Sequence, residues 1–124
     1  MNKVLIVDDD ATARFLIERT IKRAGGSPQI LTAVNGEVAL QMLHQVCSAG
    51  ACPELILLDI NMPVMDGFEF LKAVQTLYVG LIPFKVVLLT SSTDPQDIDR
   101  AKRYPVAAYL PKPLTDATFQ KIIA

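Results

Sequence analysis

The sequence has few of the residues that build soft-metal sites: two cysteines, Cys47 and Cys52, and one histidine, His44. A structural zinc site usually needs four cysteine or histidine ligands, so this set is incomplete. Disulfides are rare in a reducing cytosol. We therefore expect Cys47 and Cys52 to be free thiols with no role.

Net charge and long apolar segments are scarce too. The formal net charge is −1, so no broad basic surface argues for nucleic acid. The apolar runs are far too short to span a bilayer, and the N-terminus lacks the small-residue cleavage site of a signal peptide. We expect a cytoplasmic protein that binds neither nucleic acid nor membrane, with one domain over 1–124 and no output domain in this chain.

Short apolar runs alternate with segments of helical periodicity. The runs predict five strands: Lys3–Val7, Gln29–Val34, Leu55–Leu58, Lys85–Thr90 and Val106–Leu110. Helical patterns cover 13–24, 39–46, 70–77, 95–104 and 115–123. This alternation predicts an α/β fold: a doubly wound, five-stranded parallel sheet of order 2-1-3-4-5, flavodoxin-like, with helices on both faces. The helix over 95–104 has few apolar anchors and should be loosely held.

Polar residues stand at or just after the carboxyl ends of four of the five predicted strands: Asp8 and Asp9, Asp59, Thr90, and Lys112. Because parallel strands end at one edge of a sheet, we expect these side chains to converge there. Three carboxylates about 5 Å apart repel by roughly 3 kcal/mol per pair at an effective dielectric near 20, so they need a cation or raised pKa values. Oxygen ligands of this kind suit Mg²⁺. With the Lys112 ammonium and the Thr90 hydroxyl, they predict a cradle for a phosphoryl group arriving on Asp59.

These motifs, in this order, resemble the response-regulator receiver domain of bacterial two-component signalling. The resemblance runs from Lys3 to about Ile123. It rests on an acidic pair, a phospho-acceptor, a Met-Pro…Asp-Gly segment, a switch Ser/Thr, a switch aromatic and a Lys-Pro, matched here by Asp8-Asp9, Asp59, Met62-Pro63 with Asp66-Gly67, Thr90, Tyr109 and Lys112-Pro113.

The resemblance implies ligands and roles. Asp9, Asp59 and the backbone carbonyl of Asn61 would bind Mg²⁺ directly, and Asp8 through water. Asp59 would accept a phosphoryl group from the phosphohistidine of a sensor histidine kinase or phosphotransfer protein, or from a small donor such as acetyl phosphate. Thr90 would then hydrogen-bond that group and Tyr109 would swing inward. Asn61 and Ser92 occupy the positions where the family tunes loss of phosphate, and the Lys112–Pro113 bond would be cis.

It also implies how the signal leaves the domain. The face made by 95–104, 106–110 and 115–123 would change with phosphorylation and be read by a downstream protein or a separate output domain, or by a second copy in a homodimer. Such a switch is not an enzyme acting on other molecules; it catalyses only its own phosphorylation and dephosphorylation.

Two alternatives from other classes stay open. A flavodoxin-like flavin carrier would share the fold, but the three acids at 8–10 would repel its phosphate. A phosphatase with an aspartyl nucleophile would share the chemistry of Asp59, but it would carry an acid two residues later, where this chain has Asn61.

Overall fold

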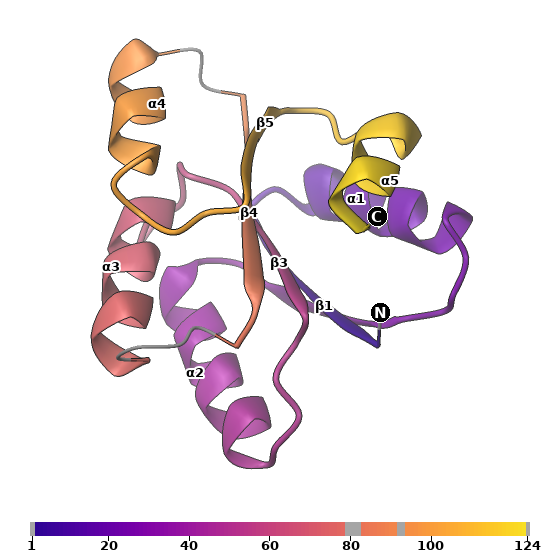
Figure 1. The fold of residues 1–124 in the computed structure, drawn as a ribbon, viewed down its shortest axis with the longest axis horizontal. Coiled ribbons are helices and arrows are strands. Elements are labelled where there is room, and N and C mark those ends of the chain that lie inside the picture. The colour runs from indigo at the N-terminus through magenta and orange to yellow at the C-terminus, as the bar shows by residue number, and fades with distance from the viewer. Residues whose placement is uncertain (1, 79–82, 92–93, 124) are drawn as a thin grey trace.

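The computed structural model describes residues 2–78, 83–91 and 94–123, which form a five-stranded parallel sheet of order β2-β1-β3-β4-β5. Helices α1 and α5 cover one face of the sheet, and α2, α3 and α4 cover the other (Figure 1). The predicted fold class and strand order are therefore confirmed. The strands are β1 Lys3–Val7, β2 Gln29–Ala33, β3 Leu55–Leu58, β4 Lys85–Thr90 and β5 Ala108–Pro111; the helices are α1 Ala11–Arg23, α2 Gly36–Ser48, α3 Gly67–Leu77, α4 Pro95–Ala101 and α5 Asp116–Ile123.

The three inner strands explain the order of the sheet. In β1, β3 and β4 consecutive large aliphatics are buried, because helices pack on both faces. Two apolar clusters result. One joins the sheet to α2, α3 and Ala101 of α4, and the other joins it to α1 and α5. Apolar packing therefore occupies both faces of the sheet, and polar side chains are found at the ends of the strands.

Capping side chains start the helices close to the strand ends. Asp10 accepts a hydrogen bond from the Thr12 N–H at the start of α1, and Asn35 accepts one from Val38 in α2. Asp66 and Glu69 form a reciprocal capping box at the start of α3. Because each cap fixes where its helix begins, the loops at the carboxyl edge are short and have defined paths.

The segment between α4 and β5 differs from prediction. The helix ends at Ala101 rather than 104, and β5 begins at Ala108 rather than Val106. Pro105 accounts for this, because the residue before a proline is biased against helical backbone. The Val106 N–H donates back to the Tyr104 carbonyl at 2.8 Å, so the chain turns before it can pair with β4.

Helix α4 is short, and the loose anchoring predicted for it holds for its apolar packing, since Ala101 is its buried residue. Aromatic contacts add to that anchor. The Arg100 guanidinium carbon lies 4.4 Å from the centroid of the Phe68 ring, and Tyr104 stacks on the same ring at 6.2 Å between centroids. A cation over an aromatic face contributes about 0.5–1 kcal/mol at an exposed site, which tethers the helix without burying it.

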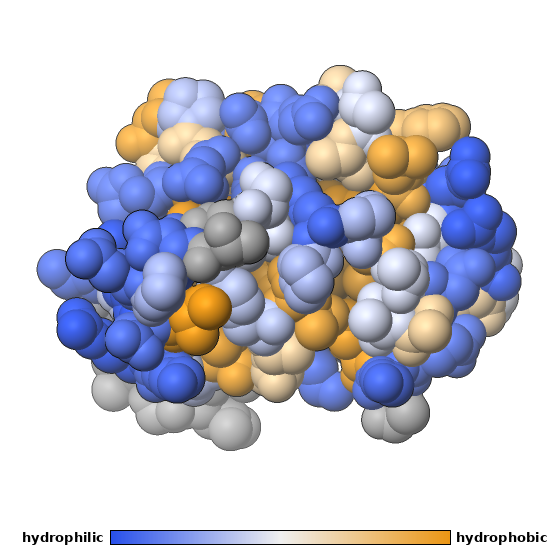
Figure 2. Space-filling model, turned by 90° about the horizontal axis from the view of Figure 1, so that it is seen from above, coloured by the Kyte–Doolittle hydropathy of each residue, from blue (hydrophilic) through white to orange (hydrophobic). Residues whose placement is uncertain are grey.

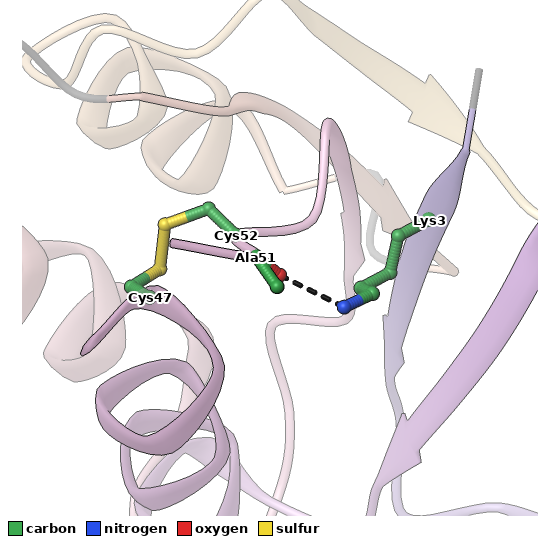
Figure 3. Close-up of a disulfide and its surroundings, with 4 residues drawn as sticks. All are labelled: Lys3, Cys47, Ala51 and Cys52. Carbon is green, nitrogen blue, oxygen red and sulfur yellow. Dashed lines mark hydrogen bonds between the residues drawn. A yellow bond between two sulfur atoms is a disulfide. The ribbon is translucent and has the colours of Figure 1, made fainter. Parts of the chain in front are cut away.

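The prediction of free cysteines was wrong. Cys47, in the last turn of α2, and Cys52, before β3, form a disulfide with their Cα atoms 4.3 Å apart (Figure 3). Gly50, with φ of +74°, reverses the chain between them and brings the two side chains together. The expectation had given the reducing compartment more weight than the closeness of the two cysteines in the sequence.

Among the described residues, none of the helices combines the length and the apolar composition needed to cross a bilayer.

Candidate functional site

Asp8 follows the last residue of β1 and is held by its neighbours. Its N–H donates to the Ala33 carbonyl of β2 at 3.0 Å, which extends the strand pairing by one residue. Its carboxylate Oδ1 accepts the Asp10 N–H at 2.9 Å, and its carbonyl accepts a hydrogen bond from Arg14 Nη1 at 2.8 Å. Asp8 is only 1% exposed, so its carboxylate is fixed at the edge of the sheet.

Asp59 holds the same place at the end of β3. Its N–H donates to the Val7 carbonyl of β1 at 2.9 Å, and its Oδ1 accepts the Ile60 N–H at 2.9 Å. The side chain is 8% exposed. The strand pairing that buries the apolar residues before Asp59 therefore presents its carboxylate beside that of Asp8.

Gly67 makes this arrangement fit. A Cβ at this position would lie 2.4 Å from the Asp59 carbonyl oxygen and 2.9 Å from the Ile60 Cα. The Gly67 N–H donates to the Ile60 carbonyl at 2.8 Å, so the start of α3 packs directly against the backbone that carries Asp59. The glycine is needed here for this close approach of two backbones.

Asp8, Asp9 and Asp59 form what we call the acid cluster: each offers a carboxylate oxygen, and the three atoms lie within 4.8 Å of one another. Asp9 is exposed, whereas the other two are buried. Figure 2 shows the molecule from above the view of Figure 1, and on this side hydrophilic and apolar residues are interspersed. Buried like charges at this spacing call for a cation, and a set of oxygen ligands fits a hard divalent ion.

Lys112, next after β5, supplies one cation. Its Nζ lies 2.6 Å from Asp8 Oδ2 and 3.5 Å from Asp59 Oδ2. Burial opposes the charge on Lys112, but the hydrogen bond to Asp8 and the charges of Asp59 and Asp8 outweigh it and raise the pKa of the ammonium. Lys112 therefore stays charged, and one positive charge faces three negative ones.

At Asp59 the surroundings as a whole disfavour the charged form of the side chain. Burial first, and then the charge of Asp8, raise the pKa of its carboxyl above the ordinary value. The Lys112 charge and the Ile60 N–H act against this rise without cancelling it. Ionised Asp59 is thus less stable here than in water, and it would be stabilised by any further positive charge.

The other predicted residues lie around this cluster. Thr90 ends β4, is fully buried, and its carbonyl accepts the Lys112 N–H at 2.8 Å. Tyr109 lies on β5, packs partly buried against the α2–α4 cluster, and has a buried hydroxyl oxygen. Asn61 is exposed two residues beyond Asp59, and Ser92 lies outside the described residues. The Lys112–Pro113 bond is cis, as predicted.

Sequence reasoning missed two residues of the site. Arg14 was not among the predicted site residues, yet its Nη1 donates to the Asp8 carbonyl. Gly67 was predicted only as part of the Met-Pro…Asp-Gly segment, without its packing against the backbone of Asp59. A signal for the arginine was present, because a residue in the first turn of α1 lies one turn from the strand end.

Comparison with known proteins gives consistent matches over the chain. The family profile described as "Response regulator receiver domain" matches residues 4–124. The two-component response regulator ORR41 of Oryza sativa subsp. japonica is 33% identical over 124 residues, which are all of this chain and 93% of that protein. A two component response regulator from Cytophaga hutchinsonii has a crystal structure with a TM-score of 0.87 and 30% identity, covering 99% of this chain and 94% of that one. The Mn(2+)-bound form of response regulator Rcp1 has a TM-score of 0.77 and 26% identity, covering 99% and 89%.

Proposed function

Because this chain belongs to the response regulator receiver domains of two-component signalling, we propose that it is a phospho-switch in which Asp59 accepts a phosphoryl group. One observation carries the proposal. Asp59 Oδ2 faces the Lys112 ammonium at 3.5 Å, within a cluster of carboxylate oxygens no more than 4.8 Å apart. A nucleophile, a fixed cation and ligands for a divalent ion thus meet at one point.

The acid cluster and the backbone carbonyl of Asn61 would hold Mg²⁺. The cluster fits such an ion because it presents oxygen ligands alone and an excess of negative charge after Lys112 is counted. When bound, the ion neutralises charge on the transferred phosphoryl oxygens. The Mn(2+)-bound state of the related regulator Rcp1 supports a divalent ion of this class.

The two oxygens of Asp59 have different surroundings. Oδ1 accepts the Ile60 N–H, while Oδ2 faces Lys112. We assign the attack to Oδ2. An electron pair of Oδ2 forms the new bond to phosphorus while the bond from phosphorus to the donor's histidine nitrogen breaks. The electron pair of the broken bond stays on that nitrogen of the imidazole ring. The Lys112 ammonium then lies beside the transferred oxygens and offsets their charge.

Readout would pass through β4 and β5. Thr90 is buried at the end of β4, which pairs with the strand that ends just before Asp59, and its hydroxyl would bond to the phosphoryl group. Tyr109 already has its hydroxyl oxygen buried, so the change at β5 would be small. The larger change would fall on α4, which is held by Ala101 and by contacts to Phe68.

The partners proposed are a sensor histidine kinase or phosphotransfer protein as the donor, and a protein that reads α4, β5 and α5, whether a separate target, an attached output domain or a second copy. The chain would act in the cytoplasm as one receiver unit over 1–124. Its catalysis would be limited to gaining and losing its own phosphoryl group.

The experiment is intact mass after incubation with acetyl phosphate and Mg²⁺. We expect the mass of one phosphoryl group to be gained, and the gain to be lost on hydroxylamine treatment and prevented by EDTA. Asp59→Asn should gain nothing. Asp66→Asn is the matched control, because it removes a carboxylate from the same loop outside the acid cluster, and it should be phosphorylated like the natural chain. A gain that persists in Asp59→Asn would refute the assignment.

A further inference from the structure

We infer that Cys47 and Cys52 form a reversible thiol–disulfide site, which exchanges electrons with low-molecular-weight thiols and disulfides of the glutathione class. The pair lies near the amino end of β3, since Cys52 precedes Leu55, whereas Asp59 follows its carboxyl end. This site has no part in the phosphoryl chemistry and is a second, separate place of modification.

The backbone alone brings the two cysteines together. The Ala51 N–H donates to the Val46 carbonyl at 2.8 Å, and the Gly50 N–H donates to the Cys47 carbonyl at 3.0 Å. These two bonds, with Gly50 at φ +74°, close the end of α2 in the Schellman arrangement. Because the turn is built from backbone hydrogen bonds, it should persist when the sulfurs are reduced.

Tertiary contacts hold the same loop from the other side. Lys3 Nζ, reaching from β1, donates to the Ala51 carbonyl at 2.9 Å (Figure 3). The Glu54 N–H donates to the Lys3 carbonyl at 3.0 Å. Pro53, which links Cys52 to Glu54, is buried. Cys52 is therefore fixed relative to α2 whether or not the disulfide is closed. A preorganised dithiol of this kind has a high effective concentration and closes readily.

The disulfide can be reached from solvent. Both cysteines are partly exposed, and a cavity of about 270 Å³ opens beside Cys47 between the ends of α2 and α3, lined by Leu40, His44, Cys47, Ser48, Leu77 and Tyr78. Cys52 does not line this cavity. An attacking thiolate therefore reaches the sulfur of Cys47 first.

The exchange balances with two equivalents of thiol. A thiolate attacks the Cys47 sulfur, the bond between the two protein sulfurs breaks, and its electron pair leaves on Cys52, which takes up a proton. A second thiolate attacks the outer sulfur of the mixed disulfide, releases Cys47 as a thiol and leaves as the oxidised small disulfide. The reverse steps, with oxidised glutathione as electron acceptor, close the protein disulfide again.

The test equilibrates the natural chain in glutathione buffers of graded ratio, followed by acid quench, alkylation with iodoacetamide and intact mass. We expect one transition from an unalkylated to a doubly alkylated protein within the range of ratios used, with little singly modified protein. A chain that stays unalkylated at every ratio would have a permanent disulfide. One that is alkylated twice even in oxidised glutathione would have independent thiols. Either result overturns the proposal.

Variants test the order of attack and the preorganised turn. Cys52→Ser should accumulate a glutathione mixed disulfide on Cys47 several-fold faster than Cys47→Ser does on Cys52, and equal rates would refute attack through the cavity. Gly50→Ala should shift the transition about fivefold towards more oxidising buffers, because a left-handed backbone is costly for alanine. Circular dichroism checks that each variant is folded. Phosphoryl capture from acetyl phosphate should be the same in the oxidised and reduced chain, so its loss would bear on Asp59 alone.

Discussion

Replacing Asp59 by asparagine should stabilise the fold when no divalent ion is bound. Asparagine keeps the size of the side chain and an oxygen that can accept the Ile60 N–H. It removes the repulsion of Asp59 by Asp8 and Asp9, about 3 kcal/mol for each pair if the oxygens lie at the upper limit of 4.8 Å and the effective dielectric is near 20. It also removes the attraction to Lys112 at 3.5 Å, about 5 kcal/mol on the same scale.

The repulsion that the substitution removes is therefore larger than the attraction that it loses. The substitution also takes a charge out of a buried position, which adds to the stability of the fold. Because Asp9 is exposed and its charge is screened, we expect a net stabilisation of about 1–2 kcal/mol. At about 4 °C per kcal/mol for a chain of this size, the variant should melt several degrees higher in EDTA at neutral pH. Differential scanning calorimetry and urea unfolding measure this difference. Asp66→Asn is the control, because asparagine also caps a helix and should change little.

The pH dependence has a defined sign. The pKa of Asp59 is raised in the folded chain above its ordinary value of 3.8. The folded state therefore binds a proton more readily than the unfolded state, and the natural chain loses stability as pH rises through the raised pKa. The gap between the natural chain and Asp59→Asn should shrink as pH falls towards 3.8.

Mg²⁺ should reverse the order of the two proteins. An ion at 100 times its dissociation constant stabilises the natural chain by about 2.7 kcal/mol. The variant has lost one charged ligand and gains less. A variant that is no more stable than the natural chain in EDTA at neutral pH would refute the electrostatic reasoning, whatever its phosphorylation.

Three further changes test other contacts. Gly67→Ala should destabilise the fold by about 2–3 kcal/mol, because its Cβ would overlap the Asp59 carbonyl, and urea unfolding would show it; an unchanged midpoint would contradict the close approach. Lys112→Met should cost about 3 kcal/mol in EDTA, since it leaves buried carboxylates unpaired, and should suppress phosphoryl gain from acetyl phosphate. Cys52→Ser should be about 2 kcal/mol less stable than the oxidised natural chain, as chain entropy predicts for a small closed loop. In dithiothreitol, where the natural chain is reduced, the two proteins should be equally stable.

The convergence of Asp8, Asp9, Asp59 and Lys112 could be predicted because it depends on topology alone. Parallel strands end at one edge, and each of these residues follows an apolar run. The contacts that depend on the path of a loop could not be predicted in this way. Gly67 approaches Asp59 only because α3 begins against the end of β3, a distance that no periodicity contains.

The remaining misses have similar physical causes. The end of α4 and the start of β5 moved because Pro105 bends the chain between them. The cysteine pair was missed because an argument from compartment outweighed a local one. The turn at Gly50 sets the Cα atoms of Cys47 and Cys52 4.3 Å apart.

The ion pair between Lys112 and Asp8 joins residues 104 positions apart, and this separation bears on protein synthesis. A ribosome adds Lys112 to the chain 104 residues after Asp8. Until then the emerging polypeptide has its acids without their ammonium. The acid cluster therefore gains the positive charge of Lys112 only after the whole intervening part of the sheet has been synthesised.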